Sequence, residues 1–389
     1  MVKLLTVVGA RPQIIKAAAL SRAIRKSFSN KISEQILHTG QHYDNNMSQV
    51  FFDEMGIPEP DFNLEVGSSG HGVQTAAMIV GVEEILITEK PDFIVLYGDT
   101  NSTLAGAIAA SKLKIPIVHI EAGLRSFNKS MPEEINRIMC DHASTLLFSP
   151  TQTGVSNLQK EGFNMSNQPP FTSDNPAVFH CGDIMYDNSL YFSEIANEKS
   201  KILEKDNLSP GEFILATIHR DNNTDDPVRM NGIFEALNHI ASNGITVFLP
   251  LHPRASKLLK QNINKNLYQK ISTNPNLIIS HPVSFLDIIK LEKNARMIIT
   301  DSGGVQKESY FFKKPCIILR PQTEWVEIVD SGAAMIVDAD KDKILKAYEY
   351  FSGKTNLNYP PVFGDGNAAE FICNQIIYFI NNYDKLTLN

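Results

Sequence analysis

Acidic side chains follow two short apolar runs of the sequence. Asp99 in YGDTNST follows residues 93–97, and Glu121 in HIEAGLRS follows residues 115–120. Glu133 in MPEEINR comes after a short loop, behind a proline that suits the first turn of a helix. If the runs are parallel strands, their carboxyl ends share one sheet edge and the acids converge there. Crowding and partial burial would then raise one or more of their pKa values, as general acid–base catalysis requires.

A simpler explanation exists for any one of these acids. Each could cap a helix, or pair with Arg125 or Arg137. The explanation is weaker for the set, because three acids are expected at the same edge. We therefore predict an acid–base site.

The segment GARPQIIK, residues 9–16, joins an expected strand to an expected helix. Gly9 permits a tight turn, Arg11 supplies a fixed cation and Pro12 suits a helix start. Lys16 lies one helical turn further on, where it adds a second charge. The segment predicts an anion site, although an ordinary strand–helix turn has the same pattern.

The segment DSGGVQKE, residues 301–308, repeats this geometry in the second half of the chain. The backbone N–H groups of Ser302, Gly303 and Gly304 could cradle a diphosphate at a helix start. Glu308 lies one turn deeper on the same face, where it could accept hydrogen bonds from two ribose hydroxyls. The pattern favours a nucleotide over the alternative of a helix-capping serine with glycines for close packing. No GxGxxG in the Rossmann position and no P-loop motif occurs.

Histidines add one further candidate. His219 and Arg220 end the run at residues 213–218, where the histidine could bind a phosphate or move a proton and the arginine could anchor a carboxylate. His38 and His42 lie four apart, but Thr39-Gly40 between them argues against a shared helix face. We predict no metal and no cofactor.

The supporting elements alternate between strand and helix patterns, which predicts an α/β fold with two doubly wound Rossmann-like domains around one cleft. The first domain is expected over residues 1–170, joined by a C-terminal helix at 366–389, and the second over residues 177–365. The Pro- and Asn-rich segment 164–176 is expected to connect them. Expected strands are 3–8, 34–38, 93–97, 115–120 and 145–149, then 213–218, 245–249, 276–280, 296–300, 315–319 and 334–337.

Composition excludes several classes of protein. The 389 residues are 43% hydrophobic with a formal charge of −7, so we expect a globular chain that binds neither nucleic acid nor membrane. No apolar run approaches the roughly 20 residues of a membrane span. Cys140, Cys181, Cys316 and Cys373 form no CxxC pair, which favours the reducing cytoplasm.

Together these motifs resemble the non-hydrolysing UDP-N-acetylglucosamine 2-epimerases. The resemblance covers nearly the whole chain and is carried by GARPQIIK, TGQH at 39–42, GDTNST, HIEAGLRS, MPEEINR, SPT at 149–151, His219-Arg220, DSGGVQKE and TEW at 323–325. It implies a glycosyltransferase-B-like fold, a homodimer, and inversion at C2 of a UDP-N-acetylhexosamine for polysaccharide precursor synthesis. The implied route eliminates UDP and re-adds it through a 2-acetamidoglucal.

The resemblance also implies roles for particular residues. The implied catalytic set is Asp99, Glu121, Glu133, His219 and Lys16. The expected UDP-sugar-binding set is Arg11, His42, Arg137, Arg220, Ser302, Gly303, Gly304 and Glu308.

Alternatives stay open for the substrate and for the activity. The segments HRDNNTDDP, CGDIMYD, PLHPR and QKESYFFKKPC resemble the branch with UDP-2,3-diacetamido-2,3-dideoxyglucuronate 2-epimerases. That substrate carries an extra carboxylate, for which Arg254 and Lys307 are candidate cations. UDP-GlcNAc is the first choice. A glycosyltransferase or a non-catalytic UDP-sugar sensor of the same fold is a further alternative, which the retained acids disfavour.

Overall fold

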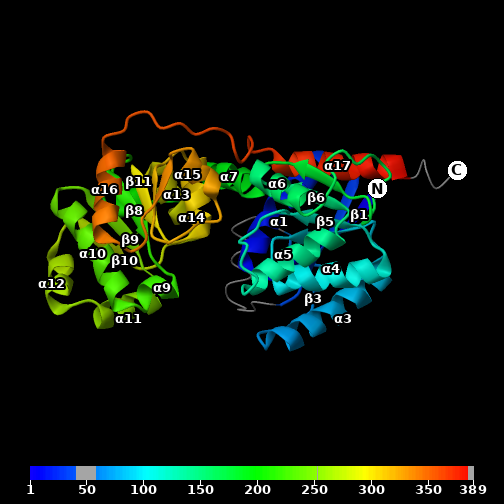
Figure 1. Ribbon diagram of the computed structural model, residues 1–389, viewed down its shortest axis with the longest axis horizontal. Coiled ribbons are helices and arrows are strands. Elements are labelled where there is room, and N and C mark those ends of the chain that lie inside the picture. The colour runs from blue at the N-terminus through cyan, green and yellow to red at the C-terminus, as the bar shows by residue number, and fades with distance from the viewer. Residues whose placement is uncertain (41–57, 252, 384–389) are drawn as a thin grey trace. The chain divides into compact units, whose positions relative to one another are not determined.

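The computed structural model describes residues 1–40, 58–251 and 253–383 (Figure 1). The chain forms two compact units. Unit 1 is Met1–Asn188 with Pro361–Asn389, and unit 2 is Ser189–Pro360.

Unit 1 is built on a parallel sheet with the strand order β3-β2-β1-β4-β5-β6-β7. Its strands are β1 (Val2–Val8), β2 (Ile32–His38), β3 (Phe62–Asn63), β4 (Phe93–Tyr97), β5 (Ile117–Ile120), β6 (Leu146–Ser149) and β7 (Ala177–His180). Every residue of β4, β5 and β6 is buried. Strands that are apolar on both faces need helices on both faces of the sheet.

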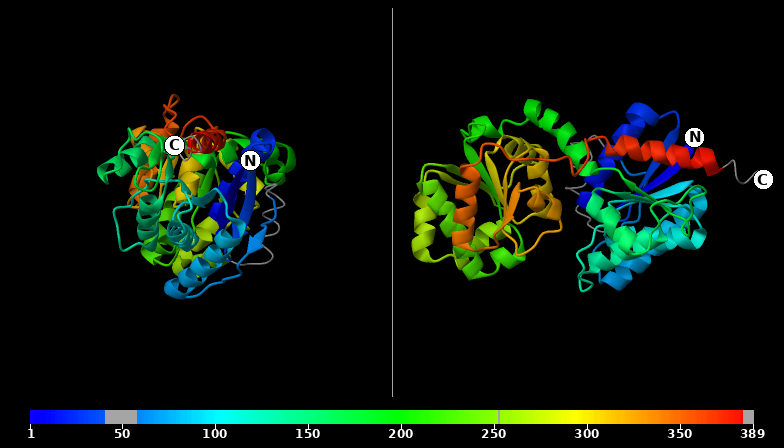
Figure 2. Two further views of the ribbon diagram at one scale, coloured as in Figure 1. Left: turned by 90° about the vertical axis from the view of Figure 1, so that its right-hand side faces the viewer. Right: turned by 45° about the horizontal axis from the view of Figure 1, so that its top comes forward.

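The helices of unit 1 supply those two layers. They are α1 (Arg11–Ala23) with one π-helical turn η1 (Ile24–Phe28), α3 (His71–Glu89), α4 (Asn101–Leu113), α5 (Pro132–Ala143), α6 (Gln152–Lys160) and α17 (Ala368–Tyr383). Helix α7 (Ile184–Lys199) begins in unit 1 and continues into unit 2. On one face, α3 and α4 pack Leu86 and Ala110 against Ile94 and Leu96. The C-terminal helix α17 lies beside α1 (Figure 2), and Phe379 meets Phe93 edge-on with ring centroids 5.0 Å apart.

Unit 2 is a second parallel sheet with the order β10-β9-β8-β11-β12-β13. Its strands are β8 (Phe213–Thr217), β9 (Thr246–Pro250), β10 (Leu277–Ser280), β11 (Met297–Thr300), β12 (Cys316–Ile318) and β13 (Ala334–Ile336). Its helices are α8 (Ile202–Lys205), α9 (Asp221–Thr224), α10 (Pro227–Ser242), α11 (Pro253–Asn262), α12 (Lys265–Thr273), α13 (Phe285–Asn294), α14 (Gly303–Phe311), α15 (Val326–Asp330) and α16 (Lys341–Ser352). One core joins the sheet to α10, α12 and α16, and a second joins its other face to α8, α13 and α14.

The α/β fold class is confirmed, and the expected strands match observed strands to within about two residues at each end. Two short strands, β3 and β7, were not expected. Strand β7 pairs with β6 and therefore belongs to the first sheet, although it lies beyond segment 164–176. Unit 1 ends within α7, after Asn188, which lies further along the chain than the expected connector at 164–176.

No helix in the described part of the chain combines the length and the apolar composition needed to cross a membrane. The four cysteines are free thiols, and Cys140, Cys316 and Cys373 are buried.

Candidate active site

A cavity of about 480 Å³ opens in unit 1 at the carboxyl ends of its strands. It is lined by Ala10, Arg11, Pro12, His71, Asp99, Thr100, Asn101, Pro132, Glu133 and Asn136. These residues come from the starts of α1, α3 and α5 and from the turn between β4 and α4. The cavity thus brings together Arg11, Asp99 and Glu133, which the sequence placed on separate motifs.

The turn before α1 is fixed by buried Gln13. Its Oε1 accepts hydrogen bonds from the backbone N–H of Gly9 at 2.9 Å and of Ala10 at 3.2 Å. A Cβ added to Gly9 would lie 2.1 Å from Ser102 Oγ, so only glycine fits there. Arg11 and Pro12 begin the helix in exposed positions. The local fold therefore holds the Arg11 backbone at the mouth of the cavity.

Glu121 and Lys16, which are not among the residues that line the cavity, form an ion pair beside Gly98. Glu121 is buried and has φ +75°, a strained left-handed conformation for a residue with a side chain. Gly98, at φ +62°, makes room for the pair, because a Cβ there would lie 3.2 Å from Glu121 Oε2 and 3.3 Å from Lys16 Nζ. The Lys16 charge is thus partnered by Glu121.

Asp99 and Glu134 are bridged by Arg137. The Asn136 amide donates to the Asp99 carbonyl at 2.9 Å, and Glu134 accepts from the backbone N–H of Ser126 and Phe127 at 2.9 Å each. Arg137 therefore fixes Asp99.

Burial raises the pKa of Asp99 above its ordinary value. Arg137 and Lys16 oppose this shift, whereas the nearby carboxylates Glu121 and Glu133 add to it. Burial is thus the largest cause of the raised pKa and like-charge crowding a smaller one, and the shift gives this edge of the sheet a carboxyl group suited to proton transfer.

A buried network beneath the cavity ties together the turns that carry the acids. His119 Nδ1 lies 2.6 Å from Asp141 Oδ1, and His119 Nε2 lies 2.9 Å from the Gly98 carbonyl oxygen. Asp141 also accepts from the Gly123 N–H at 3.1 Å and pairs with Arg125 at 2.7 Å. Since both ring nitrogens face acceptors, His119 must donate from both and is an imidazolium.

In unit 2, Asp301 organises the turn after β8. This fully buried carboxylate accepts from the backbone N–H of His219 and Arg220, at 3.2 and 3.1 Å, and from the Asn223 amide at 3.0 Å. The His219 Nδ1 lies 3.0 Å from Asp301 Oδ1, while half of the His219 side chain stays exposed. Burial alone would raise the pKa of Asp301, but these hydrogen bonds hold the pKa below its usual range.

The start of α14 is a candidate anion cradle, beside which the Arg320 guanidinium and the Glu324 carboxylate both lie. The Ser302 hydroxyl caps the helix by accepting from the Val305 N–H, and a Cβ on Gly303 would lie 3.6 Å from Arg320 Nη1. Arg320 is held by Glu324 at 2.8 Å. Desolvation and the nearby Arg320 both lower the pKa of Arg220. Two guanidiniums beside the N-terminus of a helix are an arrangement that favours an anion.

Glu308 lies one turn along α14, as expected. A Cβ on Gly304 would lie 4.0 Å from Glu308 Oε2, which places both residues on one helix face.

The two candidate cations for the extra carboxylate of a uronate substrate both have other partners. The buried Lys307 ammonium lies 4.2 Å from the Trp325 ring centroid, and exposed Arg254 pairs with Asp221 and Asp225. His42 lies outside the described residues.

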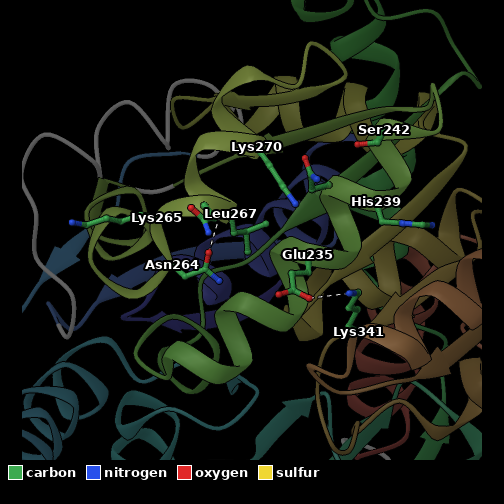
Figure 3. A pocket seen from close by; sticks show the side chains of 10 residues that line it. Glu235, His239, Ser242, Asn264, Lys265, Leu267, Lys270 and Lys341 are labelled. Atoms are coloured by element: carbon green, nitrogen blue, oxygen red, sulfur yellow. Dashed lines mark hydrogen bonds and ion pairs between the residues drawn. The ribbon is translucent and has the colours of Figure 1, made fainter.

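A separate hollow of about 610 Å³ lies on the α10 and α12 side of unit 2 (Figure 3). Its lining includes Lys265, Lys270 and His239, and Lys341 is held by Glu235 at 2.9 Å. None of the sequence-predicted site residues lines it.

Several site residues were not singled out in the sequence. His71 and Asn101 line the unit 1 cavity, and the Asn101 amide lies 3.2 Å from His71 Nδ1. His71 is the first residue of α3, directly after Gly70. Arg320 could have been found from the sequence, because it lies just beyond the end of β12, after Leu319.

The fold and these two sets of residues define the class of the protein: a two-domain α/β enzyme of the glycosyltransferase-B-like kind, with a carboxylate cavity in one domain and an anion cradle in the other. A family model described as UDP-N-acetylglucosamine 2-epimerase matches residues 24–377. The chain therefore belongs to the UDP-N-acetylglucosamine 2-epimerase family, as its motifs indicated.

Individual relatives match over nearly their full lengths. A UDP-N-acetylglucosamine 2-epimerase homolog of Methanococcus maripaludis is 48% identical, over 94% of this chain and 97% of the relative. The UDP-2,3-diacetamido-2,3-dideoxy-D-glucuronate 2-epimerase of Pseudomonas aeruginosa is 45% identical, over 95% and 98%. The crystal structure of Methanocaldococcus jannaschii UDP-GlcNAc 2-epimerase with UDP-GlcNAc and UDP has a TM-score of 0.80 at 40% identity, covering 97% of this chain and 99% of that one.

Proposed function

We propose that the protein is an isomerase that inverts C2 of a UDP-linked N-acetylhexosamine, with UDP-GlcNAc and its manno epimer as the pair interconverted. The C2 proton is not α to a carbonyl, so its removal has to be coupled to departure of UDP. A carboxylate takes the C2 proton, the C1–O bond breaks with its electron pair going to UDP, and a 2-acetamidoglucal with a C1–C2 double bond remains. Re-addition of UDP to C1 and of a proton to the other face of C2 completes the reaction.

The observation that carries this proposal is the unit 1 cavity, where Asp99, with its raised pKa, lies with Glu133 and Arg11. We assign the proton transfers to Asp99, Glu121 and Glu133, with Lys16 holding Glu121 and Arg137 holding Asp99. The contact between His219 Nδ1 and Asp301 Oδ1 at 3.0 Å orients the half-exposed imidazole ring, which suits a proton-transfer role.

We assign UDP binding mainly to unit 2. The backbone N–H groups of Ser302, Gly303 and Gly304, together with Arg220, would neutralise the diphosphate as charge builds on the leaving group. Arg320 adds a cation that the sequence had not singled out. Arg11, which lines the unit 1 cavity, and His42 are kept in the binding set from their motifs alone.

Glu308→Ala is expected to weaken UDP binding by about 1 to 3 kcal/mol, because it removes a carboxylate acceptor for the ribose hydroxyls. Calorimetric titration of UDP measures the change. Glu349→Ala, on an exposed part of α16 in the same unit, is the matched control and should leave the affinity unchanged. Equal affinities for wild type and Glu308→Ala would show that this carboxylate does not contact the ribose.

Incubation with UDP-GlcNAc in deuterated water tests the activity itself. NMR should show deuterium at C2 in a mixture of gluco and manno UDP-sugars, since the proton returned to C2 comes from solvent. Release of free N-acetylmannosamine would indicate a hydrolysing enzyme instead. Absence of exchange in a protein that still binds UDP would favour a sensor or a glycosyltransferase.

The second candidate substrate is UDP-2,3-diacetamido-2,3-dideoxyglucuronate, favoured by the 45% identity to the Pseudomonas enzyme. Its extra carboxylate needs a cation, and both Lys307 and Arg254 are already engaged, which supports UDP-GlcNAc as the first choice. We expect kcat/KM measured side by side on the two UDP-sugars to favour UDP-GlcNAc. A preference above roughly a hundredfold for the uronate, about 2.7 kcal/mol in transition-state binding, would reverse the choice.

We further propose a cytoplasmic homodimer. The family resemblance supports the dimer, and the four free thiols suit a reducing compartment. Light scattering after size-exclusion chromatography tests the dimer.

A further inference from the structure

A carboxyl group is buried in unit 2 without any donor. Glu292 on α13 has no exposed surface, and no hydrogen-bond donor of the described residues reaches either of its oxygens. The adjacent hydrophobic core of unit 2 includes Leu291 and Ala295 of the same helix and Val305 of α14. An ionised carboxylate in such a place would cost several kcal/mol, so Glu292 must hold a proton.

A second carboxyl group, that of Glu308 on α14, lies within hydrogen-bonding reach of Glu292. Two ionised carboxylates have no hydrogen to share, whereas one proton between them makes a strong hydrogen bond. Glu308 is half-buried, with Oε2 near the Gly304 end of its helix. The buried member therefore keeps the proton, and the outer member stays an acceptor.

We propose that Glu292, as a neutral carboxylic acid, is a positioning residue that donates a hydrogen bond to Glu308 and holds the Glu308 carboxylate toward the ribose hydroxyls of UDP. This inference rests on the proposed role of Glu308 in UDP binding. A carboxylate that is already oriented loses less conformational freedom when the ligand binds, so its hydrogen bonds contribute more to affinity.

Glu308 is the electrostatic partner of Glu292. Burial, followed by the charge of Glu308, raises the pKa of Glu292 well above its usual value. On β12, burial raises the pKa of Cys316 to about 12, so that thiol stays neutral and faces the pair as an uncharged group. On α13 itself, Lys290 and Lys293 donate to Asn197 and Ser193.

The pH dependence follows from the raised pKa. At a pH below this pKa, Glu292 is protonated and donates a hydrogen bond to Glu308. As the pH rises through this pKa, the proton is lost and the two carboxylates repel each other, so the affinity for UDP falls. Glu292→Gln keeps a donor at every pH and should not show this fall, whereas Glu292→Leu keeps the size but has no donor.

The experiment is calorimetric titration of UDP and of 2′-deoxy-UDP into wild type, Glu292→Gln and Glu292→Leu from pH 7 to pH 9.5. We expect Glu292→Leu to bind UDP roughly tenfold more weakly than wild type at pH 7, and Glu292→Gln to stay within about twofold. The loss should be smaller for 2′-deoxy-UDP, which lacks one of the hydroxyls. In the Glu308→Ala background, Glu292→Leu should have no further effect.

The outcomes separate this inference from the proposed activity. A wild-type UDP affinity that falls with pH more steeply than the affinity of Glu292→Gln supports it, and equal pH profiles for the two proteins overturn it. If Glu292→Leu does not fold, this pH comparison remains a complete test, and a fall of equal size in Glu292→Gln overturns the proposal. Equal wild-type affinity for UDP and 2′-deoxy-UDP also overturns it. The epimerase activity would be refuted if no deuterium entered C2 of the UDP-sugar. The positioning role of Glu292 would still stand if UDP binding showed the expected dependence on pH and on the 2′-hydroxyl.

Discussion

Glu133→Gln is expected to lower turnover by roughly a hundredfold or more while UDP binding stays nearly unchanged. Glu133 lies in the first turn of α5, exposed to the unit 1 cavity, and makes no part of the proposed diphosphate cradle in unit 2. Glutamine keeps the shape of the side chain but cannot take or give a proton. Initial rates of epimerisation by NMR and the calorimetric affinity for UDP measure the two quantities separately.

Asp99→Asn should also lower turnover with little change in UDP binding, and it should change the pH profile of the reaction. Because burial raises the pKa of Asp99, a role as proton acceptor would be lost on acidification at a higher pH than for an ordinary aspartate. The corresponding acid limb of the kcat/KM profile should vanish in Asp99→Asn.

Glu84→Gln, on the exposed side of α3, is the matched control for Glu133→Gln and should keep full activity. Near wild-type turnover in both Glu133→Gln and Asp99→Asn would refute the assignment of this cavity as the acid–base site.

The parts of the site that the sequence predicted are those fixed by local pattern. An apolar run such as residues 93–97 defines both a buried strand and its end, so Asp99 is placed at the sheet edge before any tertiary contact is known. The same logic placed Glu121 and the Ser302-Gly303-Gly304 turn. Family resemblance then supplied candidate roles that local pattern could not assign.

The parts that were missed depend on contacts between distant segments. His71 reaches the cavity because α3 starts beside Asn101, and no spacing in the sequence reports that approach. Strand β7 joins the first sheet because β6 offers it an edge, although a proline-rich segment precedes it. Glu292 is a charged residue on an amphipathic helix, and the tertiary packing of α13 against neighbouring elements buries it completely.

The largest effect on stability is expected from Asp141→Asn. Asp141 and His119 are fully buried, and Asp141 also accepts from Gly123 N–H and pairs with Arg125. Removing its charge leaves His119 and Arg125 with one fewer anionic partner in the core. Breaking a buried pair in this way costs about 3 to 5 kcal/mol, measurable as the free energy of unfolding in urea.

The loss of stability in Asp141→Asn should depend on pH, because the pKa values of both Asp141 and His119 are shifted in the folded protein. Burial alone would raise the pKa of Asp141, but His119 and Arg125 hold that pKa below its usual value, so the contribution of Asp141 is present above about pH 4. Burial alone would lower the pKa of His119, but Cys140 and Asp141 raise that pKa well above its usual value. Its contribution is complete below about pH 6.5 and declines as the pH rises toward the folded-state pKa.

The difference between wild type and Asp141→Asn should therefore be larger at pH 6 than at pH 8.5. Asp174→Asn, an exposed position in the same unit, is the control and should show no such difference. A loss for Asp141→Asn that is the same at both pH values would contradict an imidazolium at His119. Because His119 donates to the Gly98 carbonyl, next to Asp99, the same substitution should also lower turnover in the fraction that remains folded.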